Sequence, residues 1–291
     1  MIDWLRDAVE VHVHPSPSMF PRLLDDDELA AAAEAAGMYA VLFKAHEGYT
    51  MERAALAQKR CRRLKVLGGV VLNHFVGGLN PHAVAYALTM GARMVWMPTM
   101  HSANHIRWRG SASFGHQQSG MEHMTVEPLT VLDERGRLRP AVQDILELMA
   151  GRDAALGAGH LHRDEIAVLF REARARGVER LIVTHAELPF MECDVAFQAE
   201  MARLGVYIER SWLAVTHPDF GIDLARTAAE IREIGPGQVV LETDFGQATN
   251  PAPTEGLAAF CAGLHAHGLS EADVRRMVST NPAALLNLPA P

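Results

Sequence analysis

The sequence predicts a single-domain (β/α)₈ barrel, also called a TIM barrel, spanning residues 1–291. Three observations support this α/β fold class. The length is close to the ~250 residues typical of such barrels, eight short apolar segments are spaced along the chain, and a helical segment follows nearly every one of them. Repeated strand–helix units imply a parallel sheet, and eight of them favour closure into a barrel.

The predicted strands are short apolar runs without polar alternation, which is the pattern of strands that are buried on both faces. In chain order they are Ala8–Val13, Tyr39–Phe43, Lys65–Leu72, Ala92–Met97, Ala154–Ala158, Leu181–Thr184, Val206–Glu209 and Gln238–Thr243.

The segments between the strands carry start and stop signals of helices. Residues 25–28 are all acidic and lie where a helix dipole is positive, and Gly37 is expected just past the end of that helix. Asn80 and Pro81 predict an N-cap followed by the first helical residue, with Gly91 as the stop. Two further helices, Arg163–Arg176 and Glu192–Leu204, each precede a glycine.

Residues 98–140 interrupt the alternation of strands and helices, because no ordinary barrel helix is predicted there. Residues 101–120 are rich in His, Arg, Ser, Gly and Gln. Thr125–Leu132, a turn at residues 133–136 and Arg137–Leu138 predict a small β-hairpin. An insertion of this length after the fourth strand favours a lid or an active-site wall, with a surface loop as the alternative.

Composition excludes several classes of protein. The net charge is −8 with His neutral, which argues against a nucleic-acid partner. The Arg-rich stretch Lys59–Lys65 is short and is expected to form a solvated helix face. No segment is apolar enough for a signal peptide or a membrane span. The cysteines, Cys61, Cys193 and Cys261, are odd in number and far apart, so no disulfide framework is expected. We therefore expect a cytoplasmic protein that acts on a small molecule.

Histidines at the end of the first strand point to a metal site. In these barrels the chemistry lies at the C-terminal ends of the strands. His12 and His14 are two residues apart, so both imidazoles face the same side of the strand, and Val11 and Val13 are expected to face the helices. Two neutral imidazoles directed into one cavity suit a divalent first-row metal ion.

Three other strands end in residues of the same chemistry: His160 after the fifth, His185 after the sixth and Asp244 after the eighth. Four His and one Asp at one barrel mouth would be costly to desolvate without a shared charge. A metal ion there would lower the pKa of a bound water toward neutrality and supply hydroxide. Asp244 is expected to ligate the metal and to carry the proton of this water to the leaving group.

This pattern resembles the amidohydrolase superfamily, in particular its phosphotriesterase-like and related branches. The resemblance covers nearly the whole chain. The residues that carry it are His12-Val13-His14, His160, His185 and Asp244, with Leu269–Val274 and Asn281–Leu286 similar to the closing helices of these enzymes.

The resemblance implies a site with one or two metal ions, often zinc, with manganese as another candidate. His12, His14 and Asp244 would hold the first ion, and His160 and His185 the second. In many members a carbamylated Lys or a Glu from the fourth strand bridges the two ions.

Residues 92–99 of this chain contain neither of these bridging residues, which is a departure from the family pattern. Lys44, at the end of the second strand, is the nearest substitute, because burial would depress its pKa and favour carbamylation. A partner for a substrate carboxylate and a plain salt bridge are alternative roles for Lys44. Without a bridge the resemblance favours a single metal ion.

Substrate contacts are expected from residues at the barrel mouth. Arg107 and Arg109 flank Trp108 and are candidates to clamp an anionic substrate, with a solvated loop as the alternative. Glu242 is expected to support Asp244. The predicted substrate-binding residues are His46, His101, His105, Arg107 and Glu209.

We therefore expect a metal-dependent hydrolase that opens an amide, lactam or lactone bond of a small molecule. Three alternatives stay open: a metal-dependent decarboxylase of a small carboxylic acid, a metal-free lactonase, and an inactive barrel that acts as a binding protein. Association into a homo-oligomer through outer helices is also expected.

Overall fold

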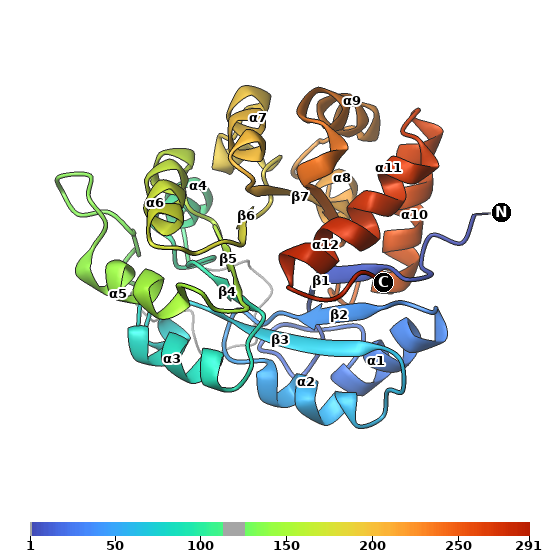
Figure 1. The fold of residues 1–291 in the computed structure, drawn as a ribbon, viewed down its shortest axis with the longest axis horizontal. Helices are drawn as coiled ribbons and strands as arrows, with labels where there is room; N and C mark the ends of the chain where they lie inside the picture. The colour runs from blue at the N-terminus through green and yellow to red at the C-terminus, as the bar shows by residue number, and fades with distance from the viewer. Residues whose placement is uncertain (1, 113–125) are drawn as a thin grey trace.

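The computed structural model describes residues 2–112 and 126–291 and confirms the predicted (β/α)₈ barrel. Eight parallel strands follow one another in chain order around the sheet, and the helices lie outside them (Figure 1). The strands are β1 (Val9–Val13), β2 (Ala40–Phe43), β3 (Lys65–Val71), β4 (Met94–Trp96), β5 (Ala155–Gly157), β6 (Leu181–Val183), β7 (Tyr207–Ser211) and β8 (Val239–Glu242).

Helices begin where the sequence signals predict them at Asp26, Pro81 and Arg163, whereas the helix predicted from Glu192 begins at Val195, because Asp194 is its N-cap. Asp25 caps the first helix in a capping box with Glu28, and the Asn80 side chain accepts a hydrogen bond from the His82 N–H ahead of Pro81. No described helix is long and apolar enough to cross a membrane. The barrel helices are α1 (Asp26–Ala35), α2 (Met51–Gln58), α3 (Pro81–Thr89), α5 (Pro140–Met149), α6 (Arg163–Ala175), α7 (Val195–Arg203), α9 (Leu224–Ile234) and α10 (Pro253–Ala266).

Shorter helical segments complete the chain, mostly after strands and at the C-terminus. The α-helical ones are α4 (Ala103–Arg109), α8 (Trp212–Thr216), α11 (Glu271–Arg275) and α12 (Asn281–Leu285), and the tighter or wider turns are η1 (His74–Val76), η2 (Pro189–Met191), η3 (Pro236–Gln238) and η4 (Arg276–Thr280).

The barrel interior is a packed apolar layer centred on Trp96 of β4. Leu285 and Leu286 belong to this inner cluster, so the C-terminal segment packs against the barrel interior. A Cβ atom added to Gly69 on β3 would lie 2.8 Å from the Trp96 ring, and one added to Gly157 on β5 would lie 2.6 Å from it. Glycine on both neighbouring strands is therefore what makes room for this indole.

A β-bulge in β1 sets the direction of the first histidine. The pairing with β2 shifts between Glu10 and Val13, and a bulge of this kind inserts one extra residue and re-aims the side chains that follow it. Val11 lies in the inner cluster and Val13 in the outer one. The expectation that Val11 faces the helices is therefore wrong, whereas Val13 does face them.

The Glu10 side chain holds this bulge in place. Its Oε1 accepts hydrogen bonds from the backbone N–H of His12 (3.1 Å) and of Thr243 (3.4 Å), and Oε2 lies 2.9 Å from the Thr243 hydroxyl. Burial raises the pKa of Glu10 to about 8, so the carboxyl group keeps its proton in neutral solution. Glu10 thereby links the bulge of β1 to the end of β8.

The insertion at residues 98–140 differs in part from its prediction. Ala103–Arg109 forms α4, capped by Ser102, where a loop was expected. Within residues 126–140 the predicted hairpin is reduced to one antiparallel bridge between Leu132 and Leu138, closed by the predicted turn at Asp133. Residues 113–125 lie outside the described residues, so the lid stays a prediction.

The bulge predicts that Glu10→Ala lowers the free energy of unfolding by ~1–3 kcal/mol, because the His12 N–H loses its buried acceptor. Glu10→Gln should stay close to the wild type, since an amide keeps an acceptor oxygen and a donor at the same places. Urea denaturation followed by circular dichroism measures both. Equal stability of the Ala and Gln variants would contradict this role.

Candidate metal centre

The first three predicted ligands meet where β8 closes against β1. The N–H of Asp244 donates to the carbonyl of His12 (3.0 Å), and the N–H of His14 donates to the carbonyl of Phe245 (2.9 Å). Asp244 Oδ1 lies 3.2 Å from His12 Nε2 and 2.9 Å from His14 Nε2. The backbone seam of the barrel thus brings two imidazoles and one carboxylate to a common point.

These spacings fit a divalent metal ion. Two ligand atoms that each lie about 2.1 Å from zinc are ~3.4 Å apart at the tetrahedral angle. The three residues offer ligand atoms that lie within 4.8 Å of one another. Imidazole nitrogen and carboxylate oxygen are also the ligand types that zinc and similar first-row metals accept.

The charge states of this trio favour a cation. Burial lowers the pKa of His14 well below its usual value, so this ring is neutral. The pKa of Asp244 is held well below its usual value by His12 and His185, although burial opposes the shift. Asp244 and Glu209 raise the pKa of His12 against burial and Lys44, so the apo site attracts a proton to His12. A metal ion would satisfy the same carboxylates.

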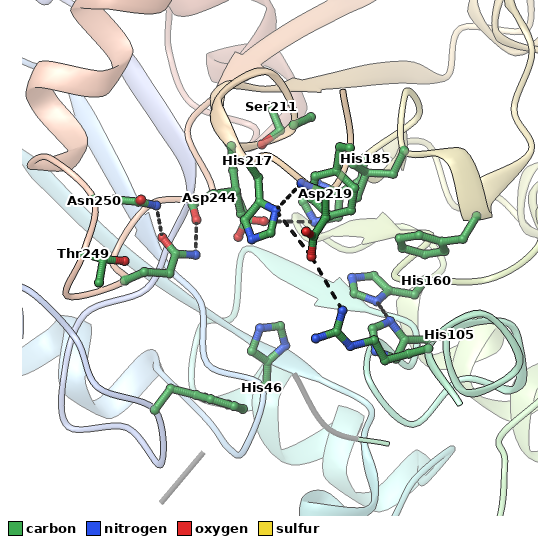
Figure 2. A pocket seen from close by; sticks show the side chains of 18 of the residues that line it. His46, His105, His160, His185, Ser211, His217, Asp219, Asp244, Thr249 and Asn250 are labelled. Carbon is green, nitrogen blue, oxygen red and sulfur yellow. Dashed lines mark hydrogen bonds and ion pairs between the residues drawn. The ribbon is translucent and has the colours of Figure 1, made fainter. Parts of the chain in front are cut away.

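The two remaining predicted ligands, His160 and His185, lie on the same side of the cavity as Asp244 (Figure 2). His185 Nε2 is 3.6 Å from Asp244 Oδ2, and the His185 ring centroid is 5.6 Å from that of His160. Asp244 therefore directs one oxygen to the histidines of β1 and the other to His185. Burial lowers the pKa of His185 to about 4 and holds the pKa of His160 well below its usual value, so both rings are neutral.

Left-handed backbone at three strand ends aims these ligands. His185 has φ of 50° and Asp244 of 52°, which is uncommon for residues other than glycine. Gly159, just before His160, has φ of 59°, and a Cβ atom there would lie 2.2 Å from the Met97 carbonyl. Such strain is typical of functional sites, because the surrounding structure must hold it in place.

Two buried glutamates lie behind the histidines. Glu209 Oε1 is 3.2 Å from His12 Nδ1 and 3.3 Å from His185 Nδ1, and it also accepts the His185 backbone N–H at 3.1 Å. Glu209 was predicted to touch substrate, but it is fully buried on β7 and supports the histidines from behind. A carboxylate on Nδ1 fixes the tautomer in which Nε2 faces a metal.

Glu242 supplies the second carboxyl group of this layer. Its Oε2 is 3.8 Å from His12 Nδ1 and its Oε1 is 3.9 Å from His185 Nδ1. Burial, together with the charges of Glu209 and Asp244, raises the pKa of Glu242 well above its usual value. Glu242 therefore carries a proton while Glu209 stays ionised.

Lys44 reaches the same centre from the end of β2. Its Nζ lies 2.7 Å from His12 Nε2, and it is fully buried. Burial lowers the pKa of Lys44, although Asp244, Glu209 and Glu242 oppose the shift. Carbamylation requires the neutral amine, and a lowered pKa makes this form of Lys44 more abundant. The side chains of β4 in the inner cluster are Met94 and Trp96, and the Trp96 ring centroid is 6.1 Å from that of His12.

The other predicted substrate contacts divide into two groups. His46 and His105 line the cavity, with His46 stacked on His14 and His105 Nδ1 3.0 Å from His160 Nδ1. His101 does not line it, because its Nδ1 accepts the His74 N–H at the side of the barrel. Arg107 is exposed, contacts Asn104 and lies outside the cavity, whereas Arg109 lines it.

The cavity above the histidines has a volume of about 480 Å³. Several of its lining residues were not identified from the sequence, because they come from loops and turns without a motif. Aromatic side chains form much of the wall. The unpredicted lining residues include Phe20, Arg22, Leu188, Phe190, Ser211, His217, Asp219, Phe220 and Gln247.

Comparison with known proteins places this chain in a family. A family described as a family of unknown function (DUF6282) matches residues 7–209, so the chain belongs to it. No curated protein sequence matches the chain.

Solved structures of amidohydrolases resemble the protein over nearly its whole length. An amidohydrolase from Pseudomonas aeruginosa has a TM-score of 0.62 at 11% identity, covering 98% of this chain and 97% of its own. A protein from Pseudomonas putida, described as a putative 2-pyrone-4,6-dicarboxylic acid hydrolase, has a TM-score of 0.60 at 14% identity, covering 97% of each chain. The phosphotriesterase homology protein from Escherichia coli scores 0.58 at 13%, covering 96% and 98%. The expected amidohydrolase resemblance is thus confirmed in the fold.

The position of Glu209 predicts that Glu209→Gln weakens metal binding ~10–100-fold, because the neutral amide no longer polarises and orients His12 and His185. Competition with a chromophoric zinc chelator measures the affinity. Glu230→Gln is the matched control, since Glu230 pairs with Arg210 at 2.9 Å and contacts neither histidine. Equal affinities of the two variants would contradict the role given to Glu209.

The position of Lys44 predicts that Lys44→Met lowers bound metal from two ions toward one per chain, because a bridging carbamate would be lost. Mass spectrometry of metals gives the stoichiometry, and ¹³C-bicarbonate labelling reports the carbamate by NMR. Lys65→Met is the control, since Lys65 begins β3 and its Nζ contacts the ring of Tyr39 instead of the histidines. Unchanged stoichiometry and no carbamate signal would leave Lys44 a structural role.

Proposed function

We propose that the protein is a metal-dependent hydrolase of a small-molecule amide, lactam or lactone. The observation that carries this proposal is the convergence of His12 Nε2, His14 Nε2 and Asp244 Oδ1 at a cavity wide enough for a small molecule. We propose zinc as the ion, held by these three residues, with His160 and His185 as ligands of a second ion. A bound divalent cation would lower the pKa of water and polarise a substrate carbonyl.

The residues of the chain divide the remaining work. Asp244 is ionised and 14% exposed, so it can accept the proton of an attacking water and pass it to the leaving group. Glu209 bonds His12 Nδ1, which directs His12 Nε2 outward, and it positions His185 by accepting the His185 backbone N–H. His105 has its pKa lowered to about 4 by burial and Arg109, so it stays neutral beside His160. A neutral imidazole can donate one hydrogen bond to a developing oxyanion.

A decarboxylase and a metal-free lactonase are the alternative functions for the same cavity, and the experiments below distinguish both from the proposed hydrolase. Cytoplasmic location and assembly into a homo-oligomer stay proposals. Each of the three candidate activities uses an ionised Asp244 close to the histidines. The metal-dependent hydrolase gives a role to every one of the five clustered residues.

The proposal predicts that Asp244→Asn keeps the fold but loses hydrolysis ~10²–10⁴-fold, because the amide cannot relay a proton. A pH-indicator assay over a panel of lactones, lactams and N-acyl amides measures turnover, and circular dichroism checks the fold. Chelation should abolish turnover of the wild type, and zinc should restore it.

Two results would contradict the proposed hydrolase. Full hydrolysis after chelation, with less than ~0.1 equivalent of bound metal, would favour a metal-free lactonase, because activation of water would then not depend on the ion. Release of CO₂ from a panel of aromatic acids, without hydrolysis of any ester or amide, would favour a decarboxylase.

A further inference from the structure

The wall of the cavity offers flat apolar surfaces. Trp108 of α4 stacks on Phe190 with ring centroids 4.6 Å apart, and on Phe220 at 6.1 Å. Phe20, from the loop after β1, also lines the cavity. Aromatic walls of this kind favour a planar apolar ligand, because offset stacking adds to the burial of its surface.

The charged groups of the cavity are balanced except at one residue. Arg109 faces Asp219 at 3.8 Å, and Asp244 faces the histidines. Arg22 lines the cavity, yet no carboxylate among residues 2–112 and 126–291 forms an ion pair with its guanidinium group. Its Nε donates to the Ser18 hydroxyl at 3.3 Å, which leaves the two terminal nitrogens of the fork without a described acceptor.

Arg22 is close to the metal centre and is held there by backbone. Its positive charge contributes to the lowered pKa values of His14, His46 and Lys44, and Arg22 and His46 line the same cavity. Arg22 forms an isolated bridge with Gln247, and the next N–H, that of Leu23, donates to the Gly246 carbonyl at 2.9 Å. The loop that carries Arg22 is therefore tied to the segment that follows Asp244.

Arg22 has no ion pair with a described carboxylate, and its Cζ lies 5.2 Å from the centroid of the Phe20 ring, a cation–π contact. Burial lowers the pKa of Arg22 to about 10, although Glu47 and Asp244 oppose the shift, so the group is desolvated and still charged in neutral solution. Glu47 accepts the Met19 N–H on Oε1 at 2.9 Å, and its Oε2 is buried without a described hydrogen-bond partner, so Glu47 acts on Arg22 through its charge and not through an ion pair within 4 Å. A planar guanidinium fork presents two parallel N–H groups, the arrangement that matches a carboxylate.

We propose that Arg22 binds a carboxylate group of the substrate, and that the substrate is a planar, aromatic-type carboxylic acid whose scissile bond faces the histidines. The proposal rests on the proposed hydrolase for the second half of this statement, and on the cavity alone for the first. The sequence pointed instead to Arg107 and Arg109 as the anion clamp. Arg107 lies outside the cavity, and Arg109, which lines it, pairs with Asp219 at 3.8 Å.

Isothermal titration calorimetry with 2-naphthoate and its neutral analogue 2-naphthamide tests this role. The variants are Arg22→Gln and, as the matched control, Arg107→Gln. All proteins are measured both loaded with zinc and after chelation, because a metal ion can itself attract a carboxylate. Thermal unfolding of each variant verifies that the fold is intact.

We expect Arg22→Gln to weaken 2-naphthoate binding ~10–100-fold, the loss of a charge-assisted pair, and to change 2-naphthamide binding by less than about twofold. Arg107→Gln should change neither, and the pattern should persist after chelation. Three results would overturn the proposal: no binding of 2-naphthoate to the wild type, no effect of Arg22→Gln on it, or equal weakening of both ligands.

The two proposals fail in different ways. If the protein binds no metal but the Arg22 dependence persists, the hydrolase is wrong and the carboxylate site stands. If zinc binds and lactones or amides are hydrolysed while Arg22→Gln has no effect on 2-naphthoate, the hydrolase stands and the carboxylate site is wrong.

Discussion

The closure of β8 onto β1 is the constraint on which the site depends. Two backbone hydrogen bonds, from Asp244 to His12 and from His14 to Phe245, determine how far the carboxylate lies from both imidazoles. The same seam is reinforced by Glu10, which bonds the bulge of β1 and the Thr243 hydroxyl of β8. Barrel closure and ligand placement are therefore one structural event, because the same bonds serve both.

Charge is arranged in layers below the cavity. The imidazoles of His12 and His185 lie between the ionised Asp244 on the cavity side and the glutamates on the inner side. Only Glu209 of that inner pair is ionised, since Glu242 keeps its proton. The glutamates thus polarise each histidine from the inner side. On the cavity side His185 is neutral, and any proton on His12 can be exchanged for a metal ion.

Much of this arrangement could be predicted from the sequence, for a physical reason. A strand buried on both faces must be apolar, so His12, His14 and Asp244 stand out where their strands end, and the closed barrel brings those ends together. The bulge at Glu10 could not be predicted, because one extra residue in a strand changes no local pattern. It is why Val11 faces inward.

Residues on loops were the least predictable part of the site. Arg107 and Arg109 share one short helix, and only the direction of α4 decides that the second lines the cavity. Arg22 has no motif around it, and its place follows from a bridge to Gln247, far away in the chain. Glu209 was identified as a site residue, but strand alternation alone does not tell an inner supporting residue from one at the mouth.

The separation of the ligands along the chain has a consequence for biosynthesis. His14 and Asp244 are 230 residues apart, so nearly the whole barrel must be made before they can meet. A growing chain emerges from the ribosome N-terminal end first. The histidine pair is therefore exposed early with no carboxylate from β8 to complete it, and the proposed capture of a metal ion would wait for the last strand. Metal loading would then mark a finished barrel.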